Sequence, residues 1–171
     1  MSGGKDYGNA IHAVMQYIRF SACSALDDIK ADVQRMVAEQ LISPEQAEAV
    51  DCESLFRFFS TSLGLKLQCS KQVLREFKFS LLDDASKYYA DATEERVLLQ
   101  GVVDCAIIDD DGIIVIDFKT DRLTDDTVCE TADKYKAQVN AYAEALRRIY
   151  NMPVKSVKLY FFAINRFVDV I

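Results

Sequence analysis

The sequence predicts an α/β domain, in which helices flank a mixed β-sheet and a helical segment precedes the sheet. Three observations support this fold class. Apolar residues recur with helical spacing before residue 64, alternate with polar residues over 73–81, and form two later strand-like pairs on either side of a long helical pattern. Strands that alternate with a helix are typical of α/β domains. We expect the order α-α-α-β-β-β-α-β-β.

The length and composition favour one soluble domain over residues 1–171. Half of the residues are hydrophobic, which is incompatible with a disordered chain. No apolar run approaches the ~18 residues that a membrane-spanning helix needs, and the first residues lack the apolar segment of a signal peptide. We therefore expect a cytoplasmic protein without membrane contact.

The five cysteines do not form a recognisable metal or disulfide pattern. They are scattered over residues 23–129 without a CxxC pair. This spacing argues against zinc, an iron–sulfur cluster and a disulfide framework. Small buried side chains in a reducing compartment are the expected alternative.

The net charge of −7, from 27 acidic and 20 basic residues, does not predict a basic nucleic-acid-binding groove. If DNA is the substrate, metal ions must neutralise part of the site. Other domains or subunits would then supply most of the affinity.

Helical periodicity places the only histidine, His12, on the first helix, with Asn9 as a plausible N-cap. Ser43 and Gln46 form a capping-box pattern that opens another helix, and Gly64 is expected to end the helical region. The expected helices cover residues 9–22, 24–41, 43–50, a further stretch up to 64, and 133–150. The expected strands cover residues 73–81, 97–108, 113–118, 156–163 and 167–171.

The sequence DDDG at 109–112 lies between two apolar segments and predicts a β-hairpin. If residues 110–111 form the turn, Asp104 lies opposite Asp117. If residues 111–112 form it, Asp104 lies opposite Lys119. Both registers gather the three charged side chains on one face, whereas a three-residue loop without a bulge would separate them. The other face is expected to be apolar and to carry Val103, Cys105, Ile107, Ile114, Ile116 and Phe118.

Two interpretations of this charged cluster remain open at this point. It could be a solvent-exposed edge with an ordinary Asp–Lys ion pair. Alternatively, two carboxylates against an apolar sheet are costly unless a cation joins them. Oxygen ligands suit Mg²⁺ or Mn²⁺, and Lys119 beside them could stabilise the charge that develops on phosphate during phosphodiester hydrolysis.

Three motifs occur in order: GVVD at 101–104, DFK at 117–119 and QVNAY at 138–142. With these motifs the sequence resembles the RecB-like branch of the PD-(D/E)xK nucleases, which have the restriction-endonuclease-like fold. Nearly the whole chain is similar to the C-terminal nuclease domains of AddA-type helicase–nuclease subunits. The lack of a four-cysteine cluster argues against the iron–sulfur branches of the family.

The resemblance implies further site residues. His12, in GNAIH, corresponds to a metal ligand, and the main-chain carbonyl of Phe118 to another. Gln138 and Tyr142 correspond to residues that position the substrate backbone and the catalytic lysine. Glu76 resembles an additional acidic position. From the residues alone, a lone histidine on a helix, such as His12, is more often a surface or satisfied core residue. Glu76 fits a surface strand position equally well, and Tyr142 fits the apolar stripe of its helix.

The resemblance implies a Mg²⁺-dependent deoxyribonuclease, an exonuclease in which Mn²⁺ can substitute. It would cut single-stranded DNA ends that a helicase delivers during double-strand-break processing, with the helicase in cis or in trans and a second helicase–nuclease subunit. The sequence has no Walker A motif, so we expect an excised domain or a stand-alone relative. The alternatives are a catalytically inactive DNA-binding or subunit-docking module and an enzyme that acts on RNA.

Overall fold

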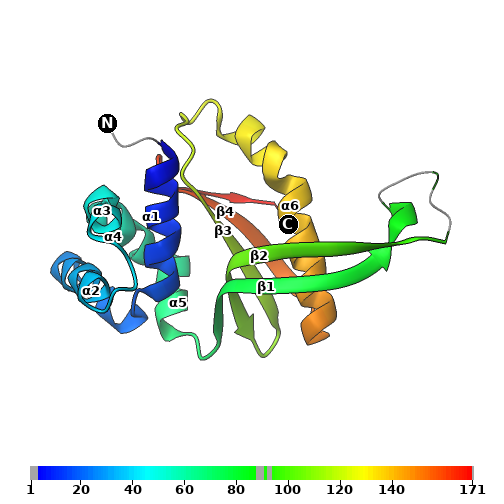
Figure 1. Ribbon diagram of the computed structural model, residues 1–171, viewed down its shortest axis with the longest axis horizontal. Helices are drawn as coiled ribbons and strands as arrows, with labels where there is room; N and C mark the ends of the chain where they lie inside the picture. The colour runs from blue at the N-terminus through cyan, green and yellow to red at the C-terminus, as the bar shows by residue number, and fades with distance from the viewer. Residues whose placement is uncertain (1–3, 88–90, 92–93, 171) are drawn as a thin grey trace.

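The computed structural model describes residues 4–87, 91 and 94–170, and these contain one mixed sheet of five strands (Figure 1). The strands lie in the sheet in chain order. Neighbours are antiparallel except β3 and β4, which are parallel because helix α6 connects them. The strands are β1 (Val73–Asp84), β2 (Arg96–Asp109), β3 (Gly112–Lys119), β4 (Val154–Phe161) and β5 (Arg166–Asp169).

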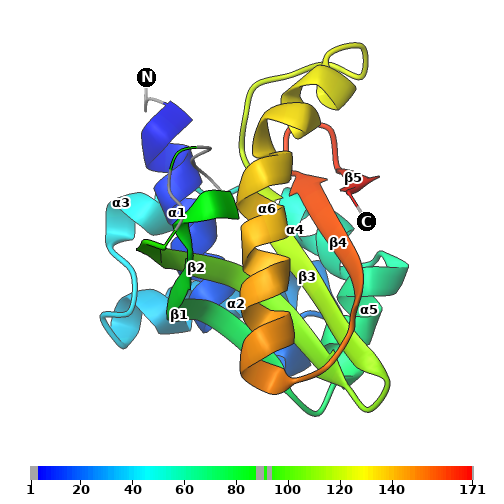
Figure 2. The same ribbon diagram turned by 90° about the vertical axis from the view of Figure 1, so that its right-hand side faces the viewer.

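Helices cover both faces of the sheet, which confirms the predicted fold class. Five helices pack on one face and α6 on the other, as Figure 2 shows with α6 in front of the sheet. Both faces of β3 are therefore buried, which explains its continuous apolar sequence. The helices are α1 (Gly4–Tyr17), α2 (Leu26–Ala38), α3 (Pro44–Ala49), α4 (Cys52–Phe59), α5 (Ser62–Cys69) and α6 (Val128–Tyr150), with short 3₁₀ turns η1 (Phe20–Ala22) and η2 (Ala85–Lys87).

Helix α1 starts earlier than predicted. The expected N-cap, Asn9, lies inside the helix, so that prediction was wrong. Asp6 in the first turn favours the earlier start, because an acidic side chain interacts well with a helix N-terminus. At the other end, Arg75 of β1 donates hydrogen bonds to the main-chain carbonyls of Gln16 and Ile18, at 3.2 and 2.6 Å. The side chain of a strand thus fixes the end of α1.

The helical region does not end at Gly64, as the sequence analysis expected. Helix α4 ends at Phe59, and α5 begins at Ser62 behind the N-cap Thr61, which accepts a hydrogen bond from the Gly64 N–H. A Cβ at Gly64 would lie 2.2 Å from the carbonyl oxygen of Phe58. Glycine is required here because it lets two helices cross closely, rather than because it terminates one. The predicted capping box of Ser43 and Gln46 is confirmed at the start of α3.

The β2–β3 hairpin has the first of the two expected registers. Asp109 pairs with Gly112 and Cys105 with Ile116, so residues 110–111 form the turn. The φ angle of Gly112 is +144°, and a Cβ there would lie 2.7 Å from the carbonyl oxygen of Pro153. A side chain at this position would be both strained and crowded, so glycine fixes the turn.

Along both β1 and β2, the regular alternation of side chains between the two faces of the sheet is interrupted at one point. Leu74 and Phe77 both pack in the core beside α6, although they are three residues apart. Between them, Glu76 has a φ angle of +47°. The same occurs around Asp104, because Val103 and Ala106 also share the α6 side. The prediction that Val103 lies on the face of Cys105 was therefore wrong. The shift turns Glu76 and Asp104 toward α1.

Candidate metal centre

His12, Glu76 and Asp104 meet where α1 crosses the first two strands of the sheet. The His12 Nδ1 atom lies 3.5 Å from an Asp104 carboxylate oxygen and 3.7 Å from a Glu76 oxygen. One potential ligand atom from each residue lies within 4.8 Å of the other two. Sequence reasoning left Glu76 between a site residue and a surface charge, and the structure places it in the cluster.

Asp104 is largely buried, and only 11% of its side chain is exposed. Its Oδ2 atom accepts a hydrogen bond of 2.8 Å from the main-chain N–H of Phe118. Burial, followed by the negative charge of Asp117, raises the pKa of Asp104 to about 7, although His12 and the Phe118 N–H act in the opposite direction. A cation at this site would relieve the cost of ionising this carboxyl group.

Asp117 lies just beyond the last β2–β3 pair and is 1% exposed. Lys119 Nζ is 2.7 Å from its Oδ2, but this oxygen receives no hydrogen bond of good geometry from any described residue. Burial raises the pKa of Asp117, and the positive charge of Lys119 opposes that rise. Asp117 is not part of the three-residue ligand group, so the structure brings the expected metal ligands together only in part.

The donor atoms at this place fit a hard divalent cation. The cluster offers carboxylate oxygens and one imidazole nitrogen, and a buried oxygen of Asp117 nearby has a place for a further partner. Mg²⁺ and Mn²⁺ take oxygen-rich ligand sets of this kind and keep several waters. The residues therefore fit the metal that the sequence analysis expected. The carbonyl of Phe118 as a ligand stays a prediction.

Two residues of α6 contact the ammonium group of Lys119. Its Nζ lies 3.8 Å from the centre of the Tyr135 ring and 3.5 Å from Gln138 Oε1. The Tyr135 hydroxyl donates a hydrogen bond of 2.9 Å to Asp121. Sequence reasoning missed Tyr135 as a site residue, because its helical spacing with Val139 and Tyr142 fits the apolar stripe of α6. The available signal was its spacing, since it lies one helical turn before Gln138.

Tyr142 packs against the sheet and also contacts Gln138, a predicted site residue. Its hydroxyl accepts a hydrogen bond of 2.6 Å from Gln138 Nε2. Its ring packs on Phe79 and on Gly101, where a Cβ would lie 2.9 Å from the Tyr142 ring. The glycine of GVVD thus provides the flat surface that lets the α6 residues approach the site.

Gly8 likewise allows a close approach, here between α1 and Thr120. A Cβ at Gly8 would lie 2.8 Å from the Thr120 hydroxyl oxygen. Gly8 and His12 are four residues apart and share one face of the helix. Close contact at Gly8 therefore places His12 over the strand ends.

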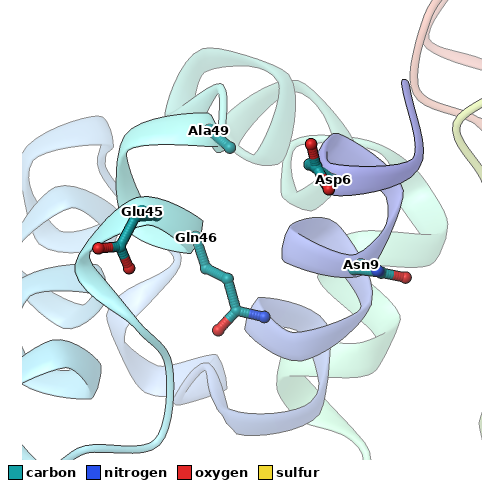
Figure 3. Close-up of a pocket in the computed structure, with 5 residues that line it drawn as sticks. All are labelled: Asp6, Asn9, Glu45, Gln46 and Ala49. Atoms are coloured by element: carbon teal, nitrogen blue, oxygen red, sulfur yellow. The ribbon is translucent and has the colours of Figure 1, made fainter. Parts of the chain in front are cut away.

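A shallow hollow of about 330 Å³ opens beside the cluster, at the end of β3. It is lined by His12, Phe118, Lys119, Thr120, Asp121, Arg122 and Tyr135. A second hollow, of about 250 Å³, lies between α1 and α3 (Figure 3). Its lining of Asp6, Asn9, Glu45, Gln46 and Ala49 includes none of the residues of the metal cluster. The first hollow is therefore the one that could admit a phosphate to the site.

Comparison with known proteins gives the family. A sequence model of the PD-(D/E)XK nuclease superfamily matches residues 2–169. The chain belongs to the PD-(D/E)XK nuclease superfamily. This match confirms the resemblance to the PD-(D/E)xK nucleases.

Several relatives are ATP-dependent helicase/nuclease proteins, each named as the A subunit. The proteins of Bacillus mycoides, Bacillus cytotoxicus and Oceanobacillus iheyensis are 36%, 35% and 32% identical to this PD-(D/E)XK chain. Each match covers 96% of the chain but only 14% of the relative. The chain thus corresponds to a small part of these proteins. None of its described helices has the length and apolar character to cross a membrane.

Proposed function

We propose that this PD-(D/E)XK domain is a Mg²⁺-dependent deoxyribonuclease, an exonuclease that hydrolyses phosphodiester bonds of DNA and accepts Mn²⁺ as a substitute. The observation that carries the proposal is the convergence of Asp104, His12 and Glu76 beside the Asp117–Lys119 pair. Three potential metal ligands, the buried carboxylate of Asp117 and the ammonium group of Lys119 lie together where α1 meets the sheet. This combination is the one that metal-assisted phosphate chemistry requires.

In this proposal His12, Asp104 and Asp117 hold the metal, with the Phe118 carbonyl and Glu76 as further ligands. A divalent ion there supplies activation of water and neutralisation of phosphate charge. The oxygen of water attacks phosphorus, the bond to the leaving sugar oxygen breaks, and the proton that the water loses is balanced by one taken up by that leaving oxygen.

Lys119 stabilises the negative charge that develops on the phosphate oxygens, because its ammonium group lies at the site and its side chain is only 12% exposed. Tyr135 and Gln138 hold that ammonium group in place. Gln138 also has donor and acceptor atoms for the substrate backbone, and Tyr142 fixes its amide.

We also propose the context of the reaction. Relatives with the same domain are named helicase/nuclease subunits, and the chain supplies only a small part of such a protein. A helicase region in cis or in trans, together with a second helicase–nuclease subunit, would feed single-stranded DNA ends to the site. The work of the domain would then be double-strand-break processing in recombinational repair, in the bacterial cytosol or nucleoid.

The alternative is a catalytically inactive module that binds DNA or docks a subunit with the same fold. The intact set of Asp104, Asp117 and Lys119 favours catalysis. Titration calorimetry with Mn²⁺ tests the metal site directly. We expect binding by the wild type and loss of most of it in Asp104→Asn, but not in Asp133→Asn, which removes an exposed carboxylate on α6. A wild type that does not bind Mn²⁺ would favour the inactive module.

A further inference from the structure

Strands β1 and β2 extend past the rest of the sheet and form a two-stranded arm (Figure 1). One face of the arm packs against α6 through Phe77, Phe79 and Leu81. Because side chains alternate along a strand, the residues between these three lie on the opposite face. We call that opposite face the open arm face. It consists of Lys78, Ser80 and Leu82 on β1 and Leu98, Gln100 and Val102 on β2.

The open arm face exposes two leucines side by side. Leu82 and Leu98 are direct cross-strand partners, and they are 51% and 54% exposed. Single exposed leucines are common on protein surfaces, but an adjacent pair on a projecting arm forms an apolar contact point. Such a pair suits a ligand that itself has apolar faces.

The charge of the open arm face is unusual for this protein. The chain has a net charge of −7, whereas the six residues of this face include Lys78 and no acidic residue. The exposed cross-strand pair Asp84 and Arg96 continues the same face beyond the leucines, and its two charges are opposite. Lys78 supplies a positive charge, and the Gln100 amide donates a hydrogen bond to the Ser80 hydroxyl at 3.4 Å. A stripe whose net charge is positive is complementary to a polyanion.

The stripe leads directly to the metal cluster. Two residues before Lys78 on β1 is Glu76, and two residues after Val102 on β2 is Asp104. Both carboxylates face α1 because the alternation of the strands shifts there. From Glu76 to Leu82 the strand spans about 20 Å, at ~3.3 Å per residue. A ligand that lies along the open arm face would therefore end at the proposed metal.

The arm is held in a fixed position from its α6 side. Arg148 of α6 donates a hydrogen bond of 3.0 Å to the carbonyl of Leu82 and lies 3.5 Å from the Asp83 carboxylate. The edge-on contact of Phe79 with Tyr142 secures the arm closer to the site. The open arm face is thus a rigid surface, which lowers the entropic cost of binding a flexible strand.

We propose that the open arm face binds the single-stranded nucleic acid that enters the metal site, so that bases contact Leu82 and Leu98 and a phosphate pairs with Lys78. Apolar side chains such as leucine can pack against bases in nucleic-acid complexes, and a lysine binds the backbone independently of sequence. The bound segment is on the order of four nucleotides long, at the short end of single-strand site sizes. This inference rests on the proposed nuclease function and adds the path of the substrate.

The test compares oligonucleotide binding in variants of the arm. Binding of a fluorescent oligothymidylate is measured in Ca²⁺ by anisotropy, with Leu82→Ser/Leu98→Ser, Lys78→Ala and a control, Leu65→Ser. Leu65 lies on α5 and is 55% exposed, so the control removes a similar leucine away from the arm. We expect about tenfold weaker binding for the double variant, as for the loss of one base contact, and wild-type binding for the control. For Lys78→Ala, the slope of log affinity against log salt concentration should decrease by about the amount expected for one lost phosphate contact.

Hydrolysis of a dinucleotide separates this inference from the proposed function. A dinucleotide does not reach the leucines, so the arm variants should cleave it and bind Mn²⁺ as the wild type does. If the wild type cleaves the dinucleotide but the double variant binds the oligonucleotide with unchanged affinity, the open arm face is not the substrate path and its leucines contact a protein instead. If the wild type cleaves neither the dinucleotide nor the oligonucleotide in Mg²⁺, the proposed function itself fails.

Discussion

The imidazole of His12 lies 3.7 Å from the carboxylate of Glu76, so a helix and an edge strand each bring a potential metal ligand to Asp104. Glu76 reaches this place only because its backbone has a φ angle of +47°, which costs energy for a residue other than glycine. A strained residue that presents a carboxylate to a ligand cluster indicates a function for that carboxylate.

Glu76→Gln should weaken Mn²⁺ binding about tenfold or more, because an amide oxygen replaces a charged ligand while the shape of the side chain is kept. Titration calorimetry measures this effect. Glu53→Gln, which changes an exposed carboxylate on α4, serves as the control and should bind as the wild type does. Equal affinity in Glu76→Gln and wild type would exclude Glu76 from the metal site.

The raised pKa of Asp104, about 7, predicts a pH-dependent response to metal. In the metal-free protein the folded state keeps a proton that the unfolded state releases near pH 4. The stability from this protonated carboxyl is present at low pH and is lost as the pH rises through about 7. A metal ion must displace the proton from the Asp104 carboxyl group. The affinity of the protein for the metal should therefore increase with pH up to about 7.

Thermal unfolding with and without Mn²⁺ at pH 6 and pH 8 measures the effect. The metal should raise the Tm more at pH 8 than at pH 6. Asp104→Asn should show little increase at either pH, since it lacks the titrating group. An equal increase in the wild type at both pH values would contradict the raised pKa.

The contact between Tyr135 and Lys119 predicts that the ring matters more than the hydroxyl. Tyr135→Leu removes the cation–π contact, and kcat should fall about tenfold, equivalent to ~1–2 kcal/mol. Tyr135→Phe keeps the ring and should restore most of the activity. Multiple-turnover cleavage over a range of oligonucleotide concentrations measures kcat separately from KM. Similar losses in both variants would assign the effect to the Asp121 hydrogen bond instead.

Strand alternation was sufficient to predict the hairpin and the grouping of Asp117 with Lys119. Two apolar runs around a DDDG turn allow few registers, and the structure has one of the two that were expected. The type and approximate position of α6 and of the last strands also followed from periodicity.

Other features of the site depend on tertiary contacts and could not be predicted in this way. The shift of alternation at Glu76 and Asp104 is a backbone irregularity, and no residue pattern marks it. The same shift placed Val103 beside α6, against expectation. Tyr135 looked like an ordinary core residue, because an aromatic ring that supports a lysine has the same spacing as one that only fills a core.

The proposed function makes Asp117 part of a metal-dependent site that cleaves DNA. We would measure cleavage of an end-labelled single-stranded oligonucleotide in Mg²⁺ by the wild type, by Asp117→Ala and by Asp111→Ala, an exposed control at the tip of the hairpin. We expect cleavage by the wild type and by Asp111→Ala and none by Asp117→Ala, with unchanged circular dichroism in all three. Undiminished cleavage by folded Asp117→Ala would contradict this assignment of the active site.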